Sequence, residues 1–228
     1  MTVTGVKTIG DEGGLHVVTC YLDGDVSIEY VAKIYDGVDY DLGDPHSSGR
    51  GCSDCMSFAD RDYSIEAWAY RMMQPSVGGT LVPAYHRSWT FNVGERWVCM
   101  ILIELVQGEC MMDIIMRAKA KDGTTGRTVL DYGRLPPEDF RIRVLQNLHE
   151  ANLFIWWHAA VKHQDLAPRN VMVKPDGGVV IIDFDDAWVN DFTSDYDRHP
   201  RTRERSPVPL PPSLIERLWP FPRGYKAD

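Results

Sequence analysis

The sequence is poor in three features that would define its class at once: paired cysteines, basic residues and long apolar runs. Five cysteines, an odd number in a chain without a secretory signal, are best interpreted as reduced thiols. Lys and Arg total 24 against 33 Asp and Glu. The net charge of −9 therefore argues against a nucleic-acid backbone as partner, and weakly against anionic membranes. The longest apolar run, Trp97 to Val106, contains Glu104 and is too short to span a bilayer.

The first residues also lack the charged-then-apolar pattern of a signal peptide, so a cytosolic (cytoplasmic) or nuclear protein is the default expectation. The chain has 228 residues and a hydrophobic content of 44%. Such a chain can bury a substantial core, either as one domain or as two small lobes.

The most informative residues of the sequence lie between Val161 and Trp188. Residues 171–173 and 179–182 are two apolar arms, and Asp176-Gly177-Gly178 lies between them. Glycine reaches positive φ without a Cβ penalty, so this stretch predicts a β-hairpin with a tight turn.

Two polar clusters flank the predicted hairpin. They consist of His163, Asp165 and Asn170 before it, and of Asp183, Asp185 and Asp186 after it. The Asp165 carboxylate can orient or deprotonate a hydroxyl, while the Asn170 amide and the Asp183 carboxylate can share a hard cation. Oxygen ligands of this kind suit Mg²⁺, which usually leaves its other positions to water and phosphate oxygens.

These clusters carry a family resemblance. HQDLAPRN matches the kinase catalytic-loop pattern H-x-D-L-x-x-x-N, and IIDFD matches the strand and magnesium loop usually written D-F-G. With both motifs in order and joined by a hairpin, the sequence resembles the protein-kinase-like superfamily, in particular small fungal protein-kinase-like proteins, with features shared with aminoglycoside and choline-type kinases. The resemblance implies an α+β, bilobal fold, with an N-lobe over residues 1–104 and a short, truncated C-lobe over residues 105–228.

The resemblance extends to the first half of the chain. The β-rich segment Ile28 to Tyr35 resembles the kinase V-A-I-K strand, with Lys33 in the lysine position. Apolar residues at helical spacing predict a helix over Asp60 to Gln74. By resemblance Glu66 on this helix is the partner of Lys33, and Asp62, with its shorter side chain, is the weaker candidate.

The nucleotide would lie between the lobes. Backbone groups from Glu104 to Val106 would receive the adenine edge, with Ile103 beside the ring. The turn Gly10 to Gly14 stands where kinases cover the phosphates, but its two acidic residues would repel phosphate. A phosphate cover and an ordinary hairpin turn are equally compatible with it.

The other elements follow from pattern. Strands are expected over 3–9, 15–22, 83–91 and 96–104, a hinge over 105–108, a short helix near Met111, a loop over 119–134 and a long helix from Pro136 to about Ala160. The long helix should bury Phe140, Val144, Leu145, Leu148, Phe154 and Ile155. Its apolar stripe would pack under the catalytic loop.

Two segments stand apart from the pattern. The long loop Asp36 to Phe58 contains Cys52 and Cys55, and a plain loop is favoured over a zinc site, which needs four ligands. After Asp186 there is room for about one helix, Ser213 to Trp219, and no A-P-E motif. The arginines Arg198, Arg201, Arg203 and Arg205 form either a solvated face or an acceptor-phosphate site. The segment Pro209 to Pro212 is either a linker or a polyproline ligand for an SH3-type partner.

Two departures from the kinase pattern bear on regulation. Gln164 replaces the arginine of H-R-D, so control through a phosphorylated activation loop is not expected. Asp185 replaces the glycine of D-F-G, which makes flipping of that loop less accessible. Arg169 stands as in D-L-A-A-R-N of tyrosine kinases.

The resemblance implies phosphoryl transfer from ATP with Mg²⁺ to a hydroxyl of an unknown protein or small-molecule acceptor. Lys33 would hold the phosphates and Glu66 would orient it, while Asn170 and Asp183 would hold the metal. Asp165 would accept the hydroxyl proton, with Arg169 beside it. The alternative is a catalytically weak or inactive pseudokinase that serves as an interaction module.

Overall fold

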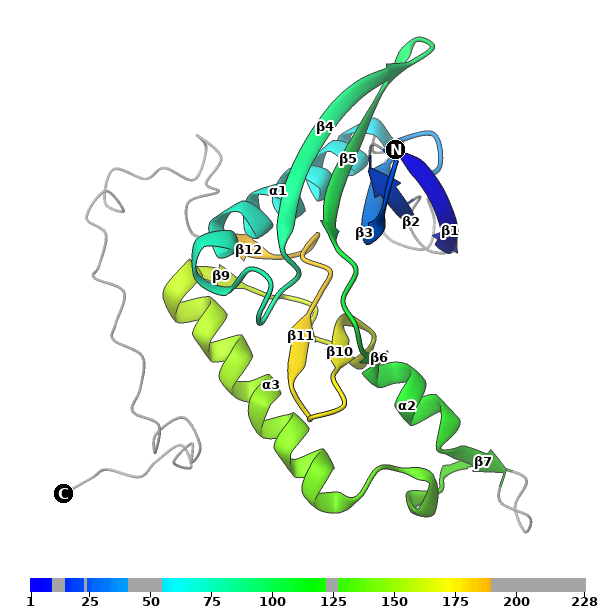
Figure 1. Ribbon diagram of the computed structural model, residues 1–228, viewed down its shortest axis with the longest axis vertical. Coiled ribbons are helices and arrows are strands. Elements are labelled where there is room, and N and C mark those ends of the chain that lie inside the picture. The colour runs from blue at the N-terminus through cyan, green and yellow to red at the C-terminus, as the bar shows by residue number, and fades with distance from the viewer. Residues whose placement is uncertain (10–14, 23, 41–54, 122–126, 190–228) are drawn as a thin grey trace, which may run out of the picture.

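The computed structural model describes residues 1–9, 15–22, 24–40, 55–121 and 127–189. It consists of a sheet-rich part that carries the N-terminus and a second part built around one long helix (Figure 1). The fold is mixed helix and sheet, which confirms the predicted α+β class. The boundary predicted between residues 104 and 105 stays a prediction. The turn 10–14, Cys52 and the segment after Val189 lie outside the described residues.

One antiparallel sheet of five strands, in the order β1-β2-β3-β5-β4, forms the first part. Its strands are β1 (Thr2–Ile9), β2 (Leu15–Leu22), β3 (Asp25–Tyr35), β4 (Tyr85–Val93) and β5 (Arg96–Glu104). Strand β5, which pairs with both β3 and β4, is buried from Val98 to Ile103, and side chains on both of its faces belong to apolar clusters. The β4–β5 hairpin projects away from the rest of the molecule (Figure 1). It turns at Gly94, whose φ of 65° is readily adopted only without a Cβ.

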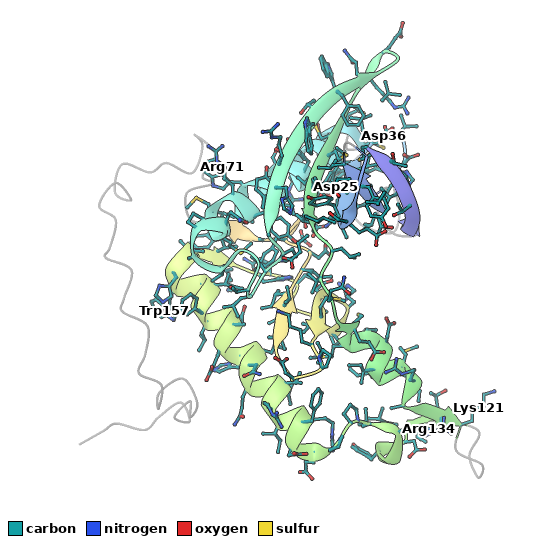
Figure 2. All side chains as sticks on the ribbon, viewed as in Figure 1. Asp25, Asp36, Arg71, Lys121, Arg134 and Trp157 are labelled. Atoms are coloured by element: carbon teal, nitrogen blue, oxygen red, sulfur yellow. The ribbon has the colours of Figure 1, made fainter. Side chains whose placement is uncertain are left out.

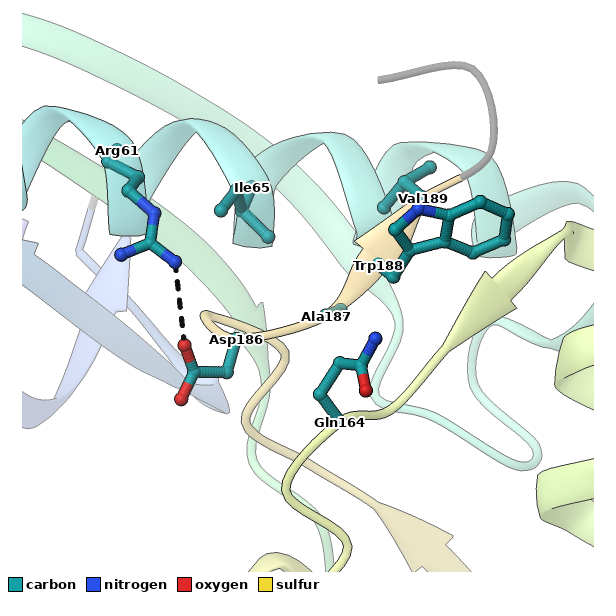
Figure 3. A pocket seen from close by; sticks show the side chains of 7 residues that line it. All are labelled: Arg61, Ile65, Gln164, Asp186, Ala187, Trp188 and Val189. Carbon is teal, nitrogen blue, oxygen red and sulfur yellow. Dashed lines mark ion pairs between the residues drawn. The ribbon is translucent and has the colours of Figure 1, made fainter. Parts of the chain in front are cut away.

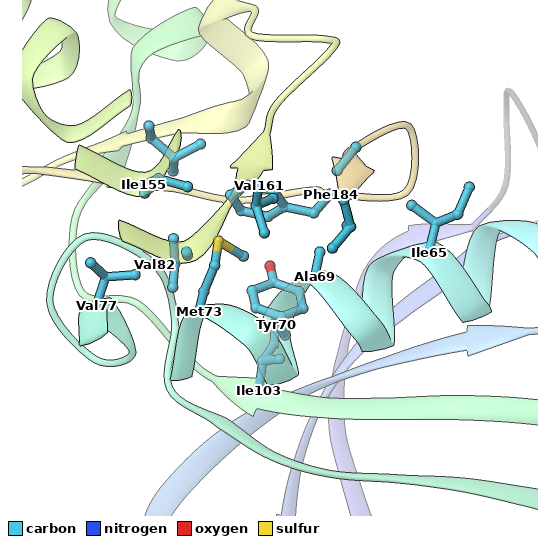
Figure 4. Close-up of a cluster of buried hydrophobic side chains, with 14 of the residues drawn as sticks. Ile65, Ala69, Tyr70, Met73, Val77, Val82, Ile103, Ile155, Val161 and Phe184 are labelled. Atoms are coloured by element: carbon cyan, nitrogen blue, oxygen red, sulfur yellow. The ribbon is translucent and has the colours of Figure 1, made fainter. Parts of the chain in front are cut away.

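The helix α1 (Cys55–Val77) packs on this sheet and is longer than the predicted span of 60–74. The loop predicted over 36–58 is therefore wrong in its last residues, since the helix already begins at Cys55. Apolar side chains of α1 meet β5, α3 and the magnesium loop in a single core (Figure 4). This core holds α1 in place against β5, α3 and the segment around Phe184.

The second part of the chain alternates short strands with helices. Its elements are β6 (Glu109–Cys110), α2 (Met111–Arg117), β7 (Lys119–Lys121), β8 (Thr128–Leu130), η1 (Tyr132–Arg134), α3 (Glu138–Ala159), β9 (Val161–Lys162), η2 (Pro168–Asn170), β10 (Val171–Val173), β11 (Val179–Ile181) and β12 (Trp188–Val189). The long helix α3 follows Pro137, carries two acidic residues in its first turn and ends before Ala160, which has φ of 55°. None of the helices within the described ranges is long and apolar enough to cross a membrane.

Two predictions for this part are wrong. Residues 119–134 are not a plain loop, because β7 and β8 pair antiparallel and η1 follows them. These strands are only three residues long and half of their residues are polar, so no alternation reveals them. The second error is Leu145, which was expected in the core but is 59% exposed. Val144 and Ile155 are buried as predicted, and Phe140, Leu148 and Phe154 pack partly buried against the core.

The predicted hairpin is present as β10 and β11, with Val171 opposite Ile181 and Val173 opposite Val179. Its turn contains Gly177 at φ 87°, the conformation for which the sequence predicted glycine. A third strand, β6, pairs with β10 and brings the backbone at Gly108 close to it. A Cβ on Gly108 would lie 2.8 Å from the carbonyl oxygen of Val173.

A second link joins the two parts at α1. The segment after α1 places the carbonyl oxygen of Leu81 2.8 Å from the backbone N–H of Ile181, which donates to it. The hairpin is therefore bonded to two segments that flank β4 and β5 in sequence: the segment before them at Leu81, and the segment after them at β6, next to Gly108.

Candidate active site

The centre of the site is a buried lysine between two carboxylates. Lys33 Nζ lies 2.7 and 2.5 Å from the two carboxylate oxygens of Glu66, and 2.6 Å from Oδ1 of Asp183. Lys33 is 5% exposed and Glu66 is fully buried. Burial opposes the charge of the lysine, but the two carboxylates outweigh it and raise the pKa of Lys33 well above its ordinary value. The lysine is therefore charged throughout the physiological range.

Glu66 is held by three donors from two segments, the strand β3 and the loop after β11. Besides Lys33, the Tyr35 hydroxyl donates to Oε2, and the backbone N–H of Phe184 donates to Oε1 over 3.1 Å. A buried carboxylate is tolerated when its oxygens are satisfied in this way. The sequence analysis missed Tyr35. Its signal was available, because residues two apart on a strand share a face and Tyr35 stands two after Lys33.

The magnesium loop turns at Asp183, whose φ is 69°. The adjacent Phe184 is fully buried, with its ring 5.5 Å from that of Tyr70 and 4.7 Å from that of His163 (Figure 4 labels Tyr70 and Phe184). Burial raises the pKa of Asp183, but the Lys33 ammonium outweighs it and lowers that pKa below its usual value. Asp183 is therefore an anion in this arrangement.

Asp185 takes the glycine place of the D-F-G pattern without strain. Among the described non-glycine residues only Ala160 and Asp183 have positive φ, so Asp185 needs no glycine-like conformation. The turn closes through the backbone N–H of Ala187, which donates to the carbonyl oxygen of Phe184 over 3.1 Å. Burial, with the charge of Asp183 beside it, raises the pKa of the Asp185 carboxyl to about 7.

The catalytic loop is organised by His163. The backbone N–H of Asp165 donates to His163 Nδ1 over 3.2 Å, which leaves Nε2 as the donor to the carbonyl oxygen of Ile182, 3.0 Å away. Burial lowers the pKa of His163, in keeping with a neutral ring in these two bonds. The ring thereby ties the catalytic loop to the strand that leads to Asp183.

Asp165 receives two side-chain donors. Arg169 Nη2 and Asn170 Nδ2 both donate to its Oδ2, the second over 3.1 Å. Asn170 Nδ2 also donates to the Asp165 carbonyl oxygen over 2.9 Å, and the Asn170 carbonyl oxygen accepts the N–H of Ile182 over 3.0 Å. These bonds place Asp165, Asn170 and Asp183 at the same end of the hairpin.

The donor set fits a hard cation. The amide nitrogen of Asn170 donates to Asp165, and Oδ1 of Asp183 accepts from Lys33. The other oxygens, Asn170 Oδ1 and Asp183 Oδ2, have no hydrogen-bond partner in the described parts of the chain. Within those parts no group of three or more His, Cys, Asp or Glu side chains could hold a metal. An ion bound by Asn170 and Asp183 would therefore need water and phosphate oxygens, as Mg²⁺ does.

The predicted adenine contacts lie at the end of β5. Ile103 is buried in the core, while Glu104 and Val106 are half-buried. The backbone N–H of Glu104 is already bonded to the Ala84 carbonyl oxygen over 2.9 Å, and its side chain accepts from the Ala84 N–H. The N–H of Val106 has no partner among the described residues and is the donor open to a ligand.

A pocket of about 470 Å³ lies beside the magnesium loop, between α1 and the catalytic loop (Figure 3). It is lined by Arg61, Ile65, Gln164, Asp186, Ala187, Trp188 and Val189. Arg61 lies 3.8 Å from Asp186 across it. Gln164 lines this pocket, in which Arg61 already has a carboxylate partner.

The structure brings together the predicted residues Lys33, Glu66 and Asp183 in one cluster, and Asp165, Arg169 and Asn170 in the adjoining one (Figure 2 shows all described side chains). Asp62 does not contact Lys33; burial, with Asp185 nearby, raises the pKa of the Asp62 carboxyl to about 6. Cys55 is a free thiol that donates to the Tyr40 carbonyl oxygen. The turn 10–14, Cys52, the arginine run and the proline-rich segment lie outside the described residues.

Comparison with protein families agrees with this geometry. Residues 119–217 match the model of the Phosphotransferase enzyme family (APH), part of the protein-kinase-like superfamily. The chain resembles this family over that stretch, which is less than half of its length but includes both the catalytic loop and the magnesium loop. The match indicates a phosphotransferase of the kinase-like type. The comparison with curated proteins gives no match.

Proposed function

We propose that this kinase-like chain transfers the terminal phosphoryl group of ATP, with Mg²⁺, to a hydroxyl of a protein or small molecule. The observation that carries the proposal is the position of Lys33, bonded at once to Glu66 and to Asp183 at the head of the magnesium loop. Because a buried ammonium needs anionic partners, this arrangement gives a fixed positive charge where a phosphate chain would lie.

Each residue then has a distinct task. Lys33, oriented by Glu66, binds phosphate oxygens, and the N–H of Val106 with the carbonyl of Glu104 receives the adenine beside Ile103. Asn170 and Asp183 hold the cation, which neutralises charge on the transferred group. Asp165 accepts the proton of the acceptor hydroxyl, and Arg169 keeps that carboxylate oriented.

One observation favours the alternative of a pseudokinase that serves as an interaction module. Lys33 pairs with Asp183 directly, at 2.6 Å, so this carboxylate has a cationic partner within the chain itself. The two functions differ in what Mg²⁺ does to nucleotide binding and in whether Asp165 matters for turnover.

Titration of the full chain with ATP, with and without Mg²⁺, tests the metal site. We expect Mg²⁺ to raise ATP affinity and Asp183→Asn to abolish that increment, because removing one carboxylate from a dication site costs roughly a few kcal/mol. Asp186→Asn is the matched control, since this neighbouring carboxylate is exposed and pairs, among the described residues, with Arg61 alone. Nucleotide binding that is indifferent to Mg²⁺ would favour the interaction module.

Asp165→Asn tests catalysis separately from binding. The substitution leaves Asn170 and Asp183 in place, so nucleotide affinity should persist. Phosphoryl transfer to an acceptor, or slow ATP hydrolysis, should fall by about 10²-fold or more when the base is lost. Equal turnover in the wild type and in this variant would count against the enzyme.

A further inference from the structure

A second groove, remote from the site, has a wholly apolar lining and encloses about 240 Å³. It lies between α2, the segment from β8 through η1, and the first half of α3. Its lining consists of Met111, Ile114, Ile115, Leu130, Leu135, Pro136, Phe140, Arg141, Val144, Leu145 and Val173. Arg141 contributes no polar surface to the lining, because its Nε–H donates to the Pro136 carbonyl oxygen over 3.0 Å. Only an apolar occupant suits such a groove.

The elements around the groove also expose large apolar side chains. Met116 on α2, Val129 on β8 and Tyr132 on η1 are 50%, 44% and 70% exposed. Leu145, in the groove itself, is the core residue of α3 that the sequence predicted to be buried. Exposed apolar side chains around an apolar groove are typical of a surface that another segment covers.

The chain supplies a suitable occupant in its last residues. Leu214, Ile215, Leu218, Trp219 and Phe221 form an apolar cluster within SLIERLWPFP. The sequence predicts one helix over 213–219, on which the first four of these residues would share a face. The family match begins at Lys119 in β7 and runs through Arg217, so it includes α3 together with Leu214 and Ile215 of this cluster.

The distance permits the contact. Residue 189 pairs with Val161 at the end of α3, and the groove lies beside Val144. The intervening helix rises by about 24 Å, at 1.5 Å per residue. The two dozen residues from 190 to 213 span up to about 80 Å when fully extended, so they can bridge this distance in many conformations.

We propose that residues 214–221 of this chain dock into the apolar groove between α2, η1 and α3, and complete the lower part of the fold in place of a larger helical subdomain. The inference does not depend on the proposed function, because the groove and the active site share no residue. It makes the carboxyl-terminal segment a structural part of the domain.

The test replaces apolar groups by charge on either side of the contact, in the full chain. On the tail, Leu214→Glu with Leu218→Glu should open the groove, and Thr202→Glu with Ser206→Glu is the control of equal charge. On the domain, Leu145→Glu should do the same. Ile142→Glu is its control, since this side chain is 48% exposed on the same helix but does not line the groove.

Hydrogen exchange and binding of an apolar dye report the outcome. In the two groove variants, amides of α2 and of residues 128–145 should exchange on the order of tenfold faster, and dye fluorescence should rise, while amides of residues 161–181 stay unchanged. Both controls should behave as the wild type. Because the tail and Leu145 form one contact, a chain that carries both the tail substitutions and Leu145→Glu should exchange little faster than either variant alone.

A synthetic peptide of residues 211–223 separates docking from general destabilisation. It should bind the Leu214→Glu, Leu218→Glu chain and restore slow exchange, and it should fail when Leu145→Glu is also present. Groove variants that match their controls would overturn the proposal. So would a wild type whose sedimentation shows a dimer that the tail variant loses, because the groove would then hold the tail of a second copy.

Discussion

Glu66 is a carboxylate without exposed surface that joins three segments of the chain. Lys33 from β3, Tyr35 from the same strand and the backbone of Phe184 all donate to it. Burial raises the pKa of Glu66, and the donors oppose that shift. One side chain therefore holds α1, Lys33 and the magnesium loop in place. Removing any one donor to Glu66 should weaken this arrangement.

Tyr35→Phe tests the donor that kinase-like motifs do not include. Removing its hydroxyl leaves a buried carboxylate oxygen with one partner fewer, so the free energy of unfolding should fall by about 1–3 kcal/mol. Urea denaturation measures this loss. Tyr63→Phe is the matched control, because the Tyr63 ring packs 5.8 Å from that of Tyr35 and its hydroxyl bonds no described residue. Equal stability of the two variants would show that the hydroxyl contributes nothing.

His163 gives the fold a pH dependence with a defined sign. Burial lowers its pKa below the ordinary 6.5. The unfolded chain then binds a proton at a pH where the folded chain does not, so the free energy of unfolding decreases as the pH falls below about 6.5.

Between about pH 8 and 5, the urea midpoint of the wild type should fall relative to that of His163→Asn, because only the wild type has this histidine. The Asp62 and Asp185 carboxyls, with pKa values of about 6 and 7, titrate in the same window in both chains, so the comparison between the two chains reports the histidine. His149→Asn, an exposed histidine on α3, should leave the slope as it is. A slope insensitive to His163 would mean that the ring remains accessible to protons in the folded chain.

At the scale of elements, the far ends of β3 and β5 are held by an ion pair. Asp36, directly after β3, is buried and accepts from Arg96 Nε over 2.9 and 3.0 Å and from Nη2 over 2.8 Å. The Arg96 hydrogen bonds lower the pKa of the Asp36 carboxyl. The pair therefore fixes the register of the two strands that carry Lys33 and the adenine edge.

Arg96→Met should lower the free energy of unfolding, because the largely buried Asp36 carboxylate loses its hydrogen-bond donors, and the partial exposure of the arginine keeps the loss small. The stabilisation is present above the unfolded pKa of 3.8 and is lost as the pH falls through the lowered folded pKa. The difference between variant and wild type should therefore narrow in acid. Arg87 is an exposed arginine on β4, and Arg87→Met should change the free energy of unfolding little at any pH. Equal losses of stability in Arg87→Met and Arg96→Met would argue against a specific pair of Arg96 with Asp36.

The pairing of β6 with β10 depends on Gly108. A Cβ there would lie 2.8 Å from a backbone oxygen that cannot move aside as a side chain could. We expect Gly108→Ala to cost about 1–3 kcal/mol, as overpacking does, and to speed amide exchange at Cys110 and Met172. Gly133→Ala is the milder control, because its Cβ would meet only the Asp131 side chain, at 3.3 Å. Unchanged exchange in Gly108→Ala would show that β6 can shift freely.

At the scale of the molecule, the sequence predicted best where its signals were local. The β10–β11 hairpin follows from two apolar arms and a glycine turn, and α3 from Pro137 and its acidic first turn. The contact of Lys33 with Glu66 followed from the family resemblance, and the structure shows it. The catalytic and metal-binding roles of these residues remain predictions.

The features that were missed depend on contacts between distant segments. The bond from Tyr35 to Glu66 requires β3 and α1 to meet in one register, which strand periodicity alone does not give. The strands β7 and β8 are too short and polar for any pattern. Leu145 was placed in the core because an apolar stripe usually buries, yet nothing in the described residues covers it.

The backbone bond between Leu81 and Ile181 and the close approach of Gly108 to Val173 leave the sheet-rich part attached to the hairpin at two places. A rotation of one part against the other that preserves these two contacts must turn about the line that joins them. Atoms near this line hardly move, whereas the tip of the β4–β5 hairpin, far from it in Figure 1, travels the longest arc. A spin label or fluorophore at Gly94 would therefore amplify small rotations that labels near the lysine would not register.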